Sequence, residues 1–240
     1  MNNKINKSID ELEKQAKKIL NLKEATHGLK RALRNLDKEI KLFKNHKPLK
    51  RTAIDNAQVQ IGGGSHYLEG FLNIDIQAPA DIICDIREGI PLSTNSALLI
   101  FSEHFLEHVD YPVSAKNFIK ESFRVLKRGG RLIIGVPDTA RVLRAYIEND
   151  DKNLKEYIQR WYGKRGLHKH FNTAIDVVNY HMRDQDDSDK YAPHLWGYDR
   201  KKLESLLRTA GFKKIKEWRF DSRIANPKRK FGSIYVEGAK

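Results

Sequence analysis

The amino-acid sequence predicts an α/β fold with a parallel sheet covered on both faces, preceded by a separate helical extension. Two observations support this prediction. From Val59 onward, short apolar runs alternate with amphipathic stretches, which is the pattern of strands joined by helices. Before that point, apolar residues recur at helical spacing and basic residues are dense. We therefore expect a basic helical extension over residues 1–50 and an α/β domain over residues 51–240.

The strands and helices of the domain are expected from runs of apolar residues bounded by turn residues. Strands are predicted at residues 59–61, 71–74, 82–84, 98–101 and 131–137, and in the final "KIKEWRF" and "GSIYVEG". One helix is predicted over Ala115–Leu126, ended by Gly129–Gly130, and another after Asp199. The segment from about Asp138 to Trp196 is expected to be helical and loop-rich.

The extension carries most of the positive charge. Residues 1–51 contain 15 Lys and Arg against 6 Asp and Glu, a net of +9 out of +14. Apolar residues fall three or four apart from Ile9 to Ile19, and after Gly28 a second set repeats every seven residues. This second set comprises Leu29, Leu33, Leu36, Ile40 and Phe43. The pattern predicts a helical hairpin packed on the domain or a short coiled coil that forms a homodimer.

A basic extension is also compatible with nucleic acid, an anionic membrane surface or an acidic protein partner. Acidic residues are interspersed among the lysines, and contact with RNA would not require a seven-residue apolar spacing. We therefore favour an apolar seam over a nucleic-acid contact.

Composition excludes several other classes of protein. No apolar run approaches the ~18 residues of a membrane span. The first residues contain no apolar signal region, so a cytoplasmic protein is expected. Cys84 is the only cysteine, which excludes an internal disulfide and a zinc site built from several cysteines.

The stretch "VQIGGGSHYLEGFLNIDI", Val59 to Ile76, places a glycine turn before a strand that ends in a carboxylate. A dinucleotide site would have a third glycine where this chain has Tyr67, and its acidic residue would come about twenty positions on. Asp75 lies only eleven residues after Gly64, which leaves no room for a full crossover helix. No Gly-Lys-Ser/Thr follows. The pattern favours a nucleoside whose ribose is held by the carboxylate over a pyrophosphate.

Four motifs in order resemble the class I S-adenosylmethionine (SAM)-dependent methyltransferases, particularly the methyltransferase type 11 group. They are "IGGGSHYLEGFLNID", "ADIICDIREGIPL", "IFSEHFLEHV" and "RVLKRGGRLIIGVP". The resemblance implies a Rossmann-like sheet of seven strands, mostly parallel, with the last strand antiparallel. One departure is Leu98, where the family usually has an aspartate before the fourth strand.

The resemblance also implies SAM as the cofactor and a set of residues around it. Asp75 would hold the ribose hydroxyls and Asp85 the adenine amino group. The cofactor-binding residues implied in all are Gly62, Gly63, Gly64, Asp75, Ile76, Asp85, Ile86, Ser102 and Glu103.

The residues after the fourth strand limit which classes of methyl acceptor are expected. Enzymes that methylate amino groups of nucleic acid bases usually carry Asn/Asp-Pro-Pro-aromatic there, whereas this chain has Ser102 to Phe105, "SEHF". Pyrimidine C5 methylation needs a cysteine nucleophile, and Cys84 falls within a predicted strand. Hydroxyl, carboxyl and simple amine acceptors remain. We favour His104 as the catalytic base for its position, with His168, His170 and His194 as further candidates.

His104, Glu107 and His108 form H-x-x-E-H, whose spacing places three potential ligands on one helical face. The motif also matches that of inverted zinc proteases, which its position after the fourth strand argues against. Some methyltransferases that act on catechol-like or terminal ribose hydroxyls carry Glu-x-x-Glu-His here and bind a divalent cation. We expect no metal and assign Glu107 and His108 to capping and packing, with a cation as the alternative.

The function expected from these residues is SAM-dependent O-methylation of a small-molecule or glycan hydroxyl. The alternatives are an RNA ribose methyltransferase, for which the basic extension argues, and a catalytically silent SAM-binding scaffold that binds a partner through its N-terminal helices.

Overall fold

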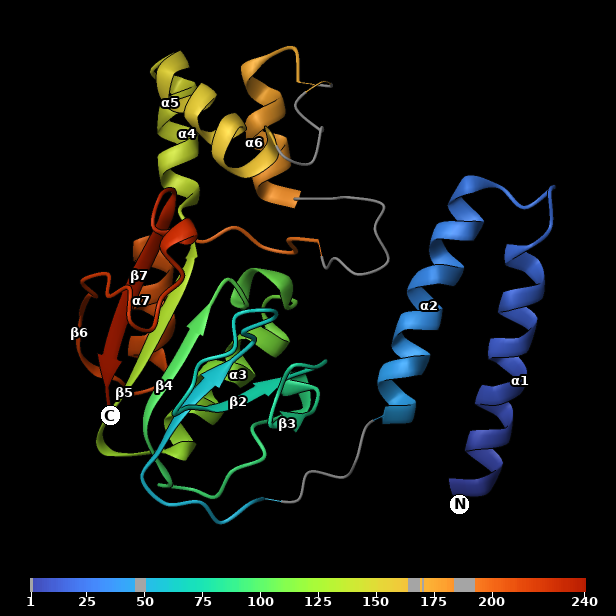
Figure 1. Cartoon of the computed structure of the whole chain (residues 1–240), viewed down its shortest axis with the longest axis horizontal. Helices are drawn as coiled ribbons and strands as arrows, with labels where there is room; N and C mark the ends of the chain where they lie inside the picture. The colour runs from blue at the N-terminus through green and yellow to red at the C-terminus, as the bar shows by residue number, and fades with distance from the viewer. Residues whose placement is uncertain (1, 46–50, 164–168, 170, 184–192) are drawn as a thin grey trace. The chain divides into compact units, whose positions relative to one another are not determined.

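The structure is a computed structural model that describes residues 2–45, 51–163, 169, 171–183 and 193–240. It divides into two compact units, Met1–Pro48 and Leu49–Lys240, and each is considered by itself (Figure 1). The predicted boundary at residue 50 stays a prediction, because residues 46–50 lie outside the described part. No described helix is long and apolar enough to cross a membrane.

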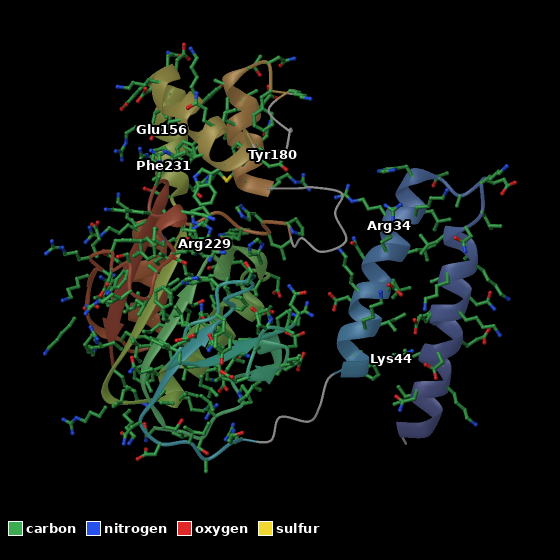
Figure 2. The ribbon with its side chains drawn as sticks, in the orientation of Figure 1. Arg34, Lys44, Glu156, Tyr180, Arg229 and Phe231 are labelled. Carbon is green, nitrogen blue, oxygen red and sulfur yellow. The ribbon has the colours of Figure 1, made fainter. Side chains whose placement is uncertain are left out.

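The first unit is a hairpin of two helices, α1 (Asn2–Leu20) and α2 (His27–Asn45). The helices pack through Ala16 and Ile40, which are both buried. Near the open end of the hairpin, Lys44 forms ion pairs with Asp10 (2.7 Å) and with Glu13; Figure 2 labels Lys44 and Arg34 on α2. The break between the helices lies at residues 21–26, and Gly28 belongs to the first turn of α2.

The apolar seam predicted for α2 is only partly covered within the hairpin. Ile40 is buried, and Leu33 and Leu36 are half-buried. Leu29 and Phe43 remain 44% and 48% exposed. The hairpin therefore leaves apolar surface uncovered at both ends of α2. A coiled coil or dimer through this seam stays a prediction.

The second unit contains a seven-stranded sheet in the order β3-β2-β1-β4-β5-β7-β6. The strands are β1 (Ala57–Ile61), β2 (Leu72–Asp75), β3 (Ile82–Ile83), β4 (Ala97–Glu103), β5 (Leu126–Pro137), β6 (Lys213–Glu217) and β7 (Ser233–Ala239). Neighbours from β3 to β5 pair in parallel, whereas β7 is antiparallel to both β5 and β6. The predicted mostly parallel sheet with an antiparallel last strand is confirmed.

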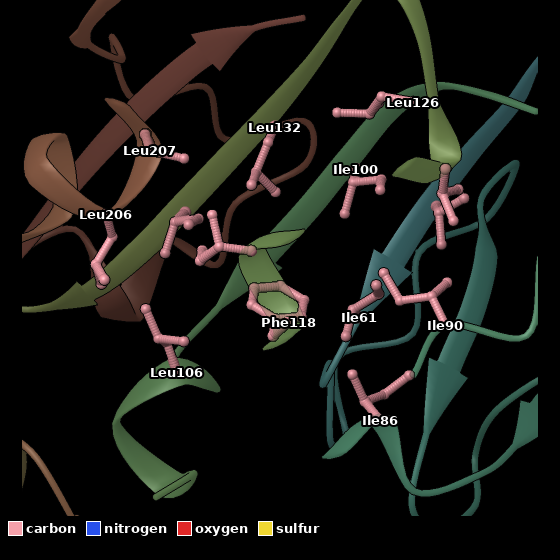
Figure 3. Packing of buried hydrophobic residues seen from close by; sticks show 14 of the residues in the cluster. Ile61, Ile86, Ile90, Ile100, Leu106, Phe118, Leu126, Leu132, Leu206 and Leu207 are labelled. Atoms are coloured by element: carbon pink, nitrogen blue, oxygen red, sulfur yellow. The ribbon is translucent and has the colours of Figure 1, made fainter. Parts of the chain in front are cut away.

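One face of the sheet is covered by α3 (Val113–Val125) and α7 (Arg200–Thr209), and the main core lies between them and the strands (Figure 3). Phe118 from α3, Leu207 from α7 and Ile100 from β4 are each at most 1% exposed. The opposite face carries Leu99, Phe101 and Ile133, which alternate with these core positions as strand geometry requires. There the strand residues pack against aromatic and apolar side chains of two loops, Leu68, Phe71, Trp218, Phe220 and Ile224.

The predicted end of helix α3 at Leu126 lies one residue from the observed end, but the prediction that Gly129 and Gly130 end the helix is wrong. The helix ends at Val125, and Leu126 already begins β5 by pairing with Ala97. Gly129 adopts a left-handed conformation (φ +80°), and its N–H donates to the carbonyl of Lys240. The two glycines therefore shape the first part of β5 and do not cap the helix.

Helices α4 (Thr139–Ile147), α5 (Asp151–Tyr157) and α6 (Ala174–Arg183), with the π-helical turn η3 (Ile158–Tyr162), form a second core beyond the carboxyl end of β5 (Figure 1). We call the described residues from 139 to 183 the helical cap. Phe231, labelled in Figure 2, lies just before β7. Its ring is 4.4 Å from the Arg141 guanidinium and 4.8 Å from that of Arg160. These contacts attach the helical cap to the sheet.

Candidate functional site

The carboxyl ends of three adjacent parallel strands, β2, β1 and β4, meet at one edge of the sheet, where open α/β sheets bind ligands. Gly62 to Gly64 follow β1, Asp75 ends β2 and Glu103 ends β4. The fold therefore brings the predicted glycine turn, carboxylate and post-β4 segment together. Residues 62–71 contain no helix between β1 and β2, which agrees with the prediction that a full crossover helix does not fit there.

The glycine turn, Gly62 to Gly64, needs its first and last residues for different reasons. Gly62 has φ +69°, and a Cβ on it would lie 2.4 Å from the ring of Phe105. Gly64 has φ +58°, but a Cβ there would meet nothing within 4 Å. Gly62 is thus fixed by packing against the segment after β4. Gly64 leaves open space beside a backbone that a ligand can approach closely.

Asp75 is 8% exposed and lies opposite the glycine turn. Its Oδ2 accepts a hydrogen bond from the Gly64 N–H (2.9 Å), and its Oδ1 accepts one from the Gln77 N–H (3.2 Å). A carboxylate has about four acceptor positions, so two contacts orient it and leave capacity for two ribose hydroxyls. Ile76, the next residue, is 39% exposed beside it. This arrangement fits a nucleoside cofactor.

Asp85 begins the short helix η1 (Ile86–Glu88) as its N-cap. Its carboxylate accepts from the Arg87 N–H (2.9 Å) and is bound by the Arg87 guanidinium, with the closest nitrogen at 2.7 Å. Ile86 is buried. Between the two aspartates, burial and then the charges of Asp85 and Asp75 raise the pKa of the Cys84 thiol to about 11. A thiol held neutral in this way is a poor nucleophile.

Ser102 and Glu103, at the end of β4, are both 1% exposed. The Ser102 hydroxyl has no hydrogen-bond partner among the residues that the structure describes. The Glu103 carboxylate accepts from the Tyr235 hydroxyl (2.6 Å) and the Asn226 N–H (3.2 Å), and it pairs with Arg229 (3.3 Å). The Glu103 carboxylate is therefore bound by residues from the C-terminal part of the chain.

His104 has φ +54°, an uncommon conformation for a residue other than glycine that is often found at functional sites. Its Nε2 lies 2.7 Å from the Ser233 hydroxyl, and its ring stacks on Trp161 of the helical cap at 5.4 Å. Burial, and then the positive charge of Arg229, lowers the pKa of His104 well below its usual value. The imidazole is therefore neutral at physiological pH.

Glu107 lies at the centre of a group of imidazoles. The buried carboxylate has its Oε1 3.6 Å from His104 Nδ1 and 3.9 Å from His108 Nε2. His194 reaches the same place from a distant segment, because the Leu195 N–H donates to the Glu107 carbonyl (2.7 Å). One ligand atom each from Glu107, His108 and His194 lies within 4.8 Å of the others. We call His104, Glu107, His108 and His194 the histidine cluster.

Of the four histidines proposed as bases, the structure brings His104 and His194 to this cluster. His168 and His170 lie outside the described residues. Sequence reasoning missed Ser233 and Trp161 as the neighbours of His104, and it did not pair His194 with Glu107. No local spacing signals these contacts, because 129 residues separate His104 from Ser233 and 85 separate His108 from Pro193, whose carbonyl it contacts.

Residues 51–134 match a family model described as "Methyltransferase domain". The match spans the glycine turn, both aspartates, β4, α3 and the parallel part of β5. No curated protein matches the chain significantly.

Three of the solved structures that the chain resembles are described as methyltransferases. A SAM-dependent methyltransferase from Methanosarcina mazei is 16% identical, with 82% of this chain and 96% of that chain covered and a TM-score of 0.47. One from Archaeoglobus fulgidus is 14% identical over 88% and 94% of the two chains (TM-score 0.46). A possible histamine N-methyltransferase from Thermotoga maritima is 17% identical over 83% and 86% (TM-score 0.44). Because these identities are low, the activities in the three descriptions belong to those proteins and are not assigned to this chain.

Proposed function

We propose that the chain is a class I SAM-dependent methyltransferase that methylates a hydroxyl of a small molecule or glycan. The match of residues 51–134 to a methyltransferase-domain family model supports this proposal. When bound, SAM would supply a methyl group for transfer to the acceptor oxygen in line with the carbon–sulfur bond, and S-adenosylhomocysteine would be released. A hydroxyl acceptor must also lose its proton. The chain therefore has to bind the cofactor, orient the hydroxyl and accept one proton.

We assign the cofactor to the edge formed by the glycine turn and Asp75. The open space at Gly64 and the two oriented oxygens of Asp75 support this assignment. SAM supplies the activated methyl group when it is bound there. Asp85 would accept from the adenine amino group with capacity that the Arg87 contacts leave. Ile76, Ile86 and Ser102 would line the same edge, whereas Glu103 has its main contacts elsewhere.

The observation that carries the choice of a hydroxyl is the position of His104, beside Glu107 and next to a residue, Phe105, that packs on the glycine turn. A neutral ring can accept the proton that a hydroxyl gives up, and the carboxylate of Glu107, 3.6 Å from Nδ1, would stabilise the imidazolium that forms. Phe105, the next residue, contacts the glycine turn. The proposed base therefore adjoins the proposed cofactor edge.

The helical cap supports a compact acceptor. Trp161 of the cap stacks directly on His104, so the acceptor side of the site has a wall made by the cap. A site walled in this way excludes water from a reacting hydroxyl and favours a small molecule or the end of a glycan over the interior of a polymer.

A labelled-methyl assay tests this function. The purified chain is incubated with SAM carrying a labelled methyl group and with separate pools of small hydroxyl compounds, glycans, simple amines and RNA. We expect label in a base-stable ether in the first or second pool. Label in an N-methyl product, or in RNA ribose alone, would contradict the proposal. SAM binding without transfer to any pool would favour the scaffold alternative.

We further propose that the hairpin Met1–Pro48 makes a protein contact, in the simplest case with a second copy. The partly exposed seam of α2 supports this. The double variant Leu33→Asp and Leu36→Asp should lower the mass measured by light scattering to that of a monomer. Salt-dependent RNA binding by the chain, with a wild-type mass in the double variant, would contradict it.

A further inference from the structure

The histidine cluster contains two imidazoles beside Glu107, those of His108 and His194, that neither the methyltransferase match nor the proposed base accounts for. Glu107 is 2% exposed, so its charge lies away from water. Burying a carboxylate costs several kcal/mol unless other groups balance it. Among the described residues, imidazoles lie close to this carboxylate, and an imidazole can balance a carboxylate by taking up a proton or by sharing a cation with it.

The hydrogen-bond partners of His108 and His194 favour a shared cation. The Nδ1 of His194 lies 2.8 Å from the carbonyl oxygen of His181, and the Nδ1 of His108 lies 3.3 Å from that of Pro193. A carbonyl only accepts hydrogen bonds, so each Nδ1 carries the proton. In a neutral ring, the lone pair is then on Nε2. Metal-binding histidines are oriented in this way, by a second-shell acceptor on the other ring nitrogen.

The distances are close to those around an ion. The ligand atoms of Glu107, His108 and His194 lie within 4.8 Å of one another, and Glu107 Oε1 is 3.9 Å from His108 Nε2. Atoms bound at about 2.1 Å to a tetrahedral ion lie roughly 3.4 Å apart. Small rotations of the three side chains would close this gap. The backbone is already fixed, because Glu107 is tied to Leu195 and Trp196 through its carbonyl.

We infer that Glu107, His108 and His194 bind a divalent first-row transition-metal ion. Two imidazole nitrogens and one carboxylate oxygen suit Zn²⁺, Fe²⁺, Mn²⁺ or Co²⁺, whereas Mg²⁺ and Ca²⁺ prefer oxygen ligands alone. The site differs from the H-x-x-E-H set of the sequence, because His194 takes the place of His104. Three protein ligands leave a coordination position open, which an acceptor oxygen could occupy beside His104. That role in the reaction rests on the proposed function; binding of the ion does not.

The test uses Co²⁺ as the probe, on the full chain, without SAM or acceptor. After treatment with a chelator and buffer exchange, titration at neutral pH should give visible d–d absorption that saturates at one ion per chain and is displaced by Zn²⁺. Glu107→Gln and His194→Gln should each weaken Co²⁺ binding at least about tenfold. His27→Gln, in the N-terminal hairpin, is the matched control and should leave binding unchanged.

Three results would overturn the inference: no saturable absorption in the wild-type chain, unchanged binding in both cluster variants, or equal weakening in the His27 control. SAM affinity and thermal unfolding of each variant check its fold, and His108→Gln replaces any variant that unfolds. Because the absorption is read without methyl transfer, a failure of the metal inference and a failure of the O-methylation proposal are separate outcomes.

Discussion

The glycine turn after β1 and the histidine cluster after β4 adjoin the same edge of the sheet. The first half of this site is formed mainly by backbone and the second by side chains. The glycine turn presents backbone: two residues at positive φ, open space at Gly64 and one carboxylate to hold them. The histidine cluster consists of packed side chains from two distant segments, and Trp161 and Ser233 contact it at His104. The backbone half suits a cofactor that many enzymes share, and the side-chain half suits chemistry particular to this chain. Phe105 joins the two halves by packing on Gly62.

The largest effect that this comparison predicts is on catalysis at His104. His104→Asn removes the imidazole but keeps a residue that tolerates positive φ. If His104 accepts the proton, turnover should fall about 10²- to 10⁴-fold while SAM affinity stays near the wild-type value. Single-turnover methyl transfer and calorimetry measure the two quantities. A parallel loss of both would mean that the two halves do not act separately.

Gly62 and Gly64 form a matched pair for stability. Gly62→Ala adds a Cβ that overlaps the Phe105 side chain, and it should lower the free energy of unfolding by about 2–5 kcal/mol through overpacking and backbone strain. Gly64→Ala has similar backbone strain but no clash, so its cost should be about 1–2 kcal/mol. Urea unfolding of both variants provides the measurement. Equal losses would show that packing against Phe105 does not fix the turn.

A substitution of Asp75 tests the proposed cofactor site at the glycine turn without changing the histidine cluster. Asp75→Ala should weaken binding of S-adenosylhomocysteine by about 1.5–3 kcal/mol, since the lost hydrogen bonds involve a charged acceptor. Calorimetry on the full chain gives the affinity. Wild-type affinity in this variant would remove Asp75 from the cofactor site.

The smallest predicted effect concerns Cys84, between the two aspartates. With its pKa raised to about 11, the folded thiol is nearly all protonated at pH 8. Alkylation should therefore be about 10- to 30-fold slower than in the denatured chain, allowing for the greater nucleophilicity of a high-pKa thiolate. The rate should keep rising with pH up to about 11. Mass spectrometry can follow the reaction, because the chain has a single cysteine. A plateau near pH 8.5 would mean that neither burial nor the aspartates raise the pKa of Cys84.

The same contrast explains what the sequence predicted. The strands leading to Gly62, Asp75 and Glu103 were predictable because each is a short apolar run ended by a turn or a polar residue. The glycine turn was predictable because backbone geometry selects glycine locally. The end of α3 was not, because Gly129 and Gly130 serve the pairing at the start of β5 and resemble a helix cap only in sequence.

The histidine cluster could be predicted only as far as its local spacing extends. H-x-x-E-H placed His104, Glu107 and His108 near one another. The positive φ of His104, its contact with Ser233 and the arrival of His194 depend on tertiary structure. A single sequence carries no signal for contacts of this length, because they follow from how β7 and the segment before α7 return to the sheet.

The contacts of Glu103 have a consequence for how the chain folds. The carboxylate ends the central strand β4, and its partner Tyr235 comes 132 residues later, in β7. At a synthesis rate of about 5–20 residues per second, a ribosome needs roughly 10 s to make that stretch. During that interval, closing the sheet would bury a charge without its native donors, so the nascent strand should stay hydrated and leave Leu99 and Phe101 accessible to a chaperone. Because the contact spans so much of the sequence, we expect completion of the sheet around β7 to be a slow step in folding.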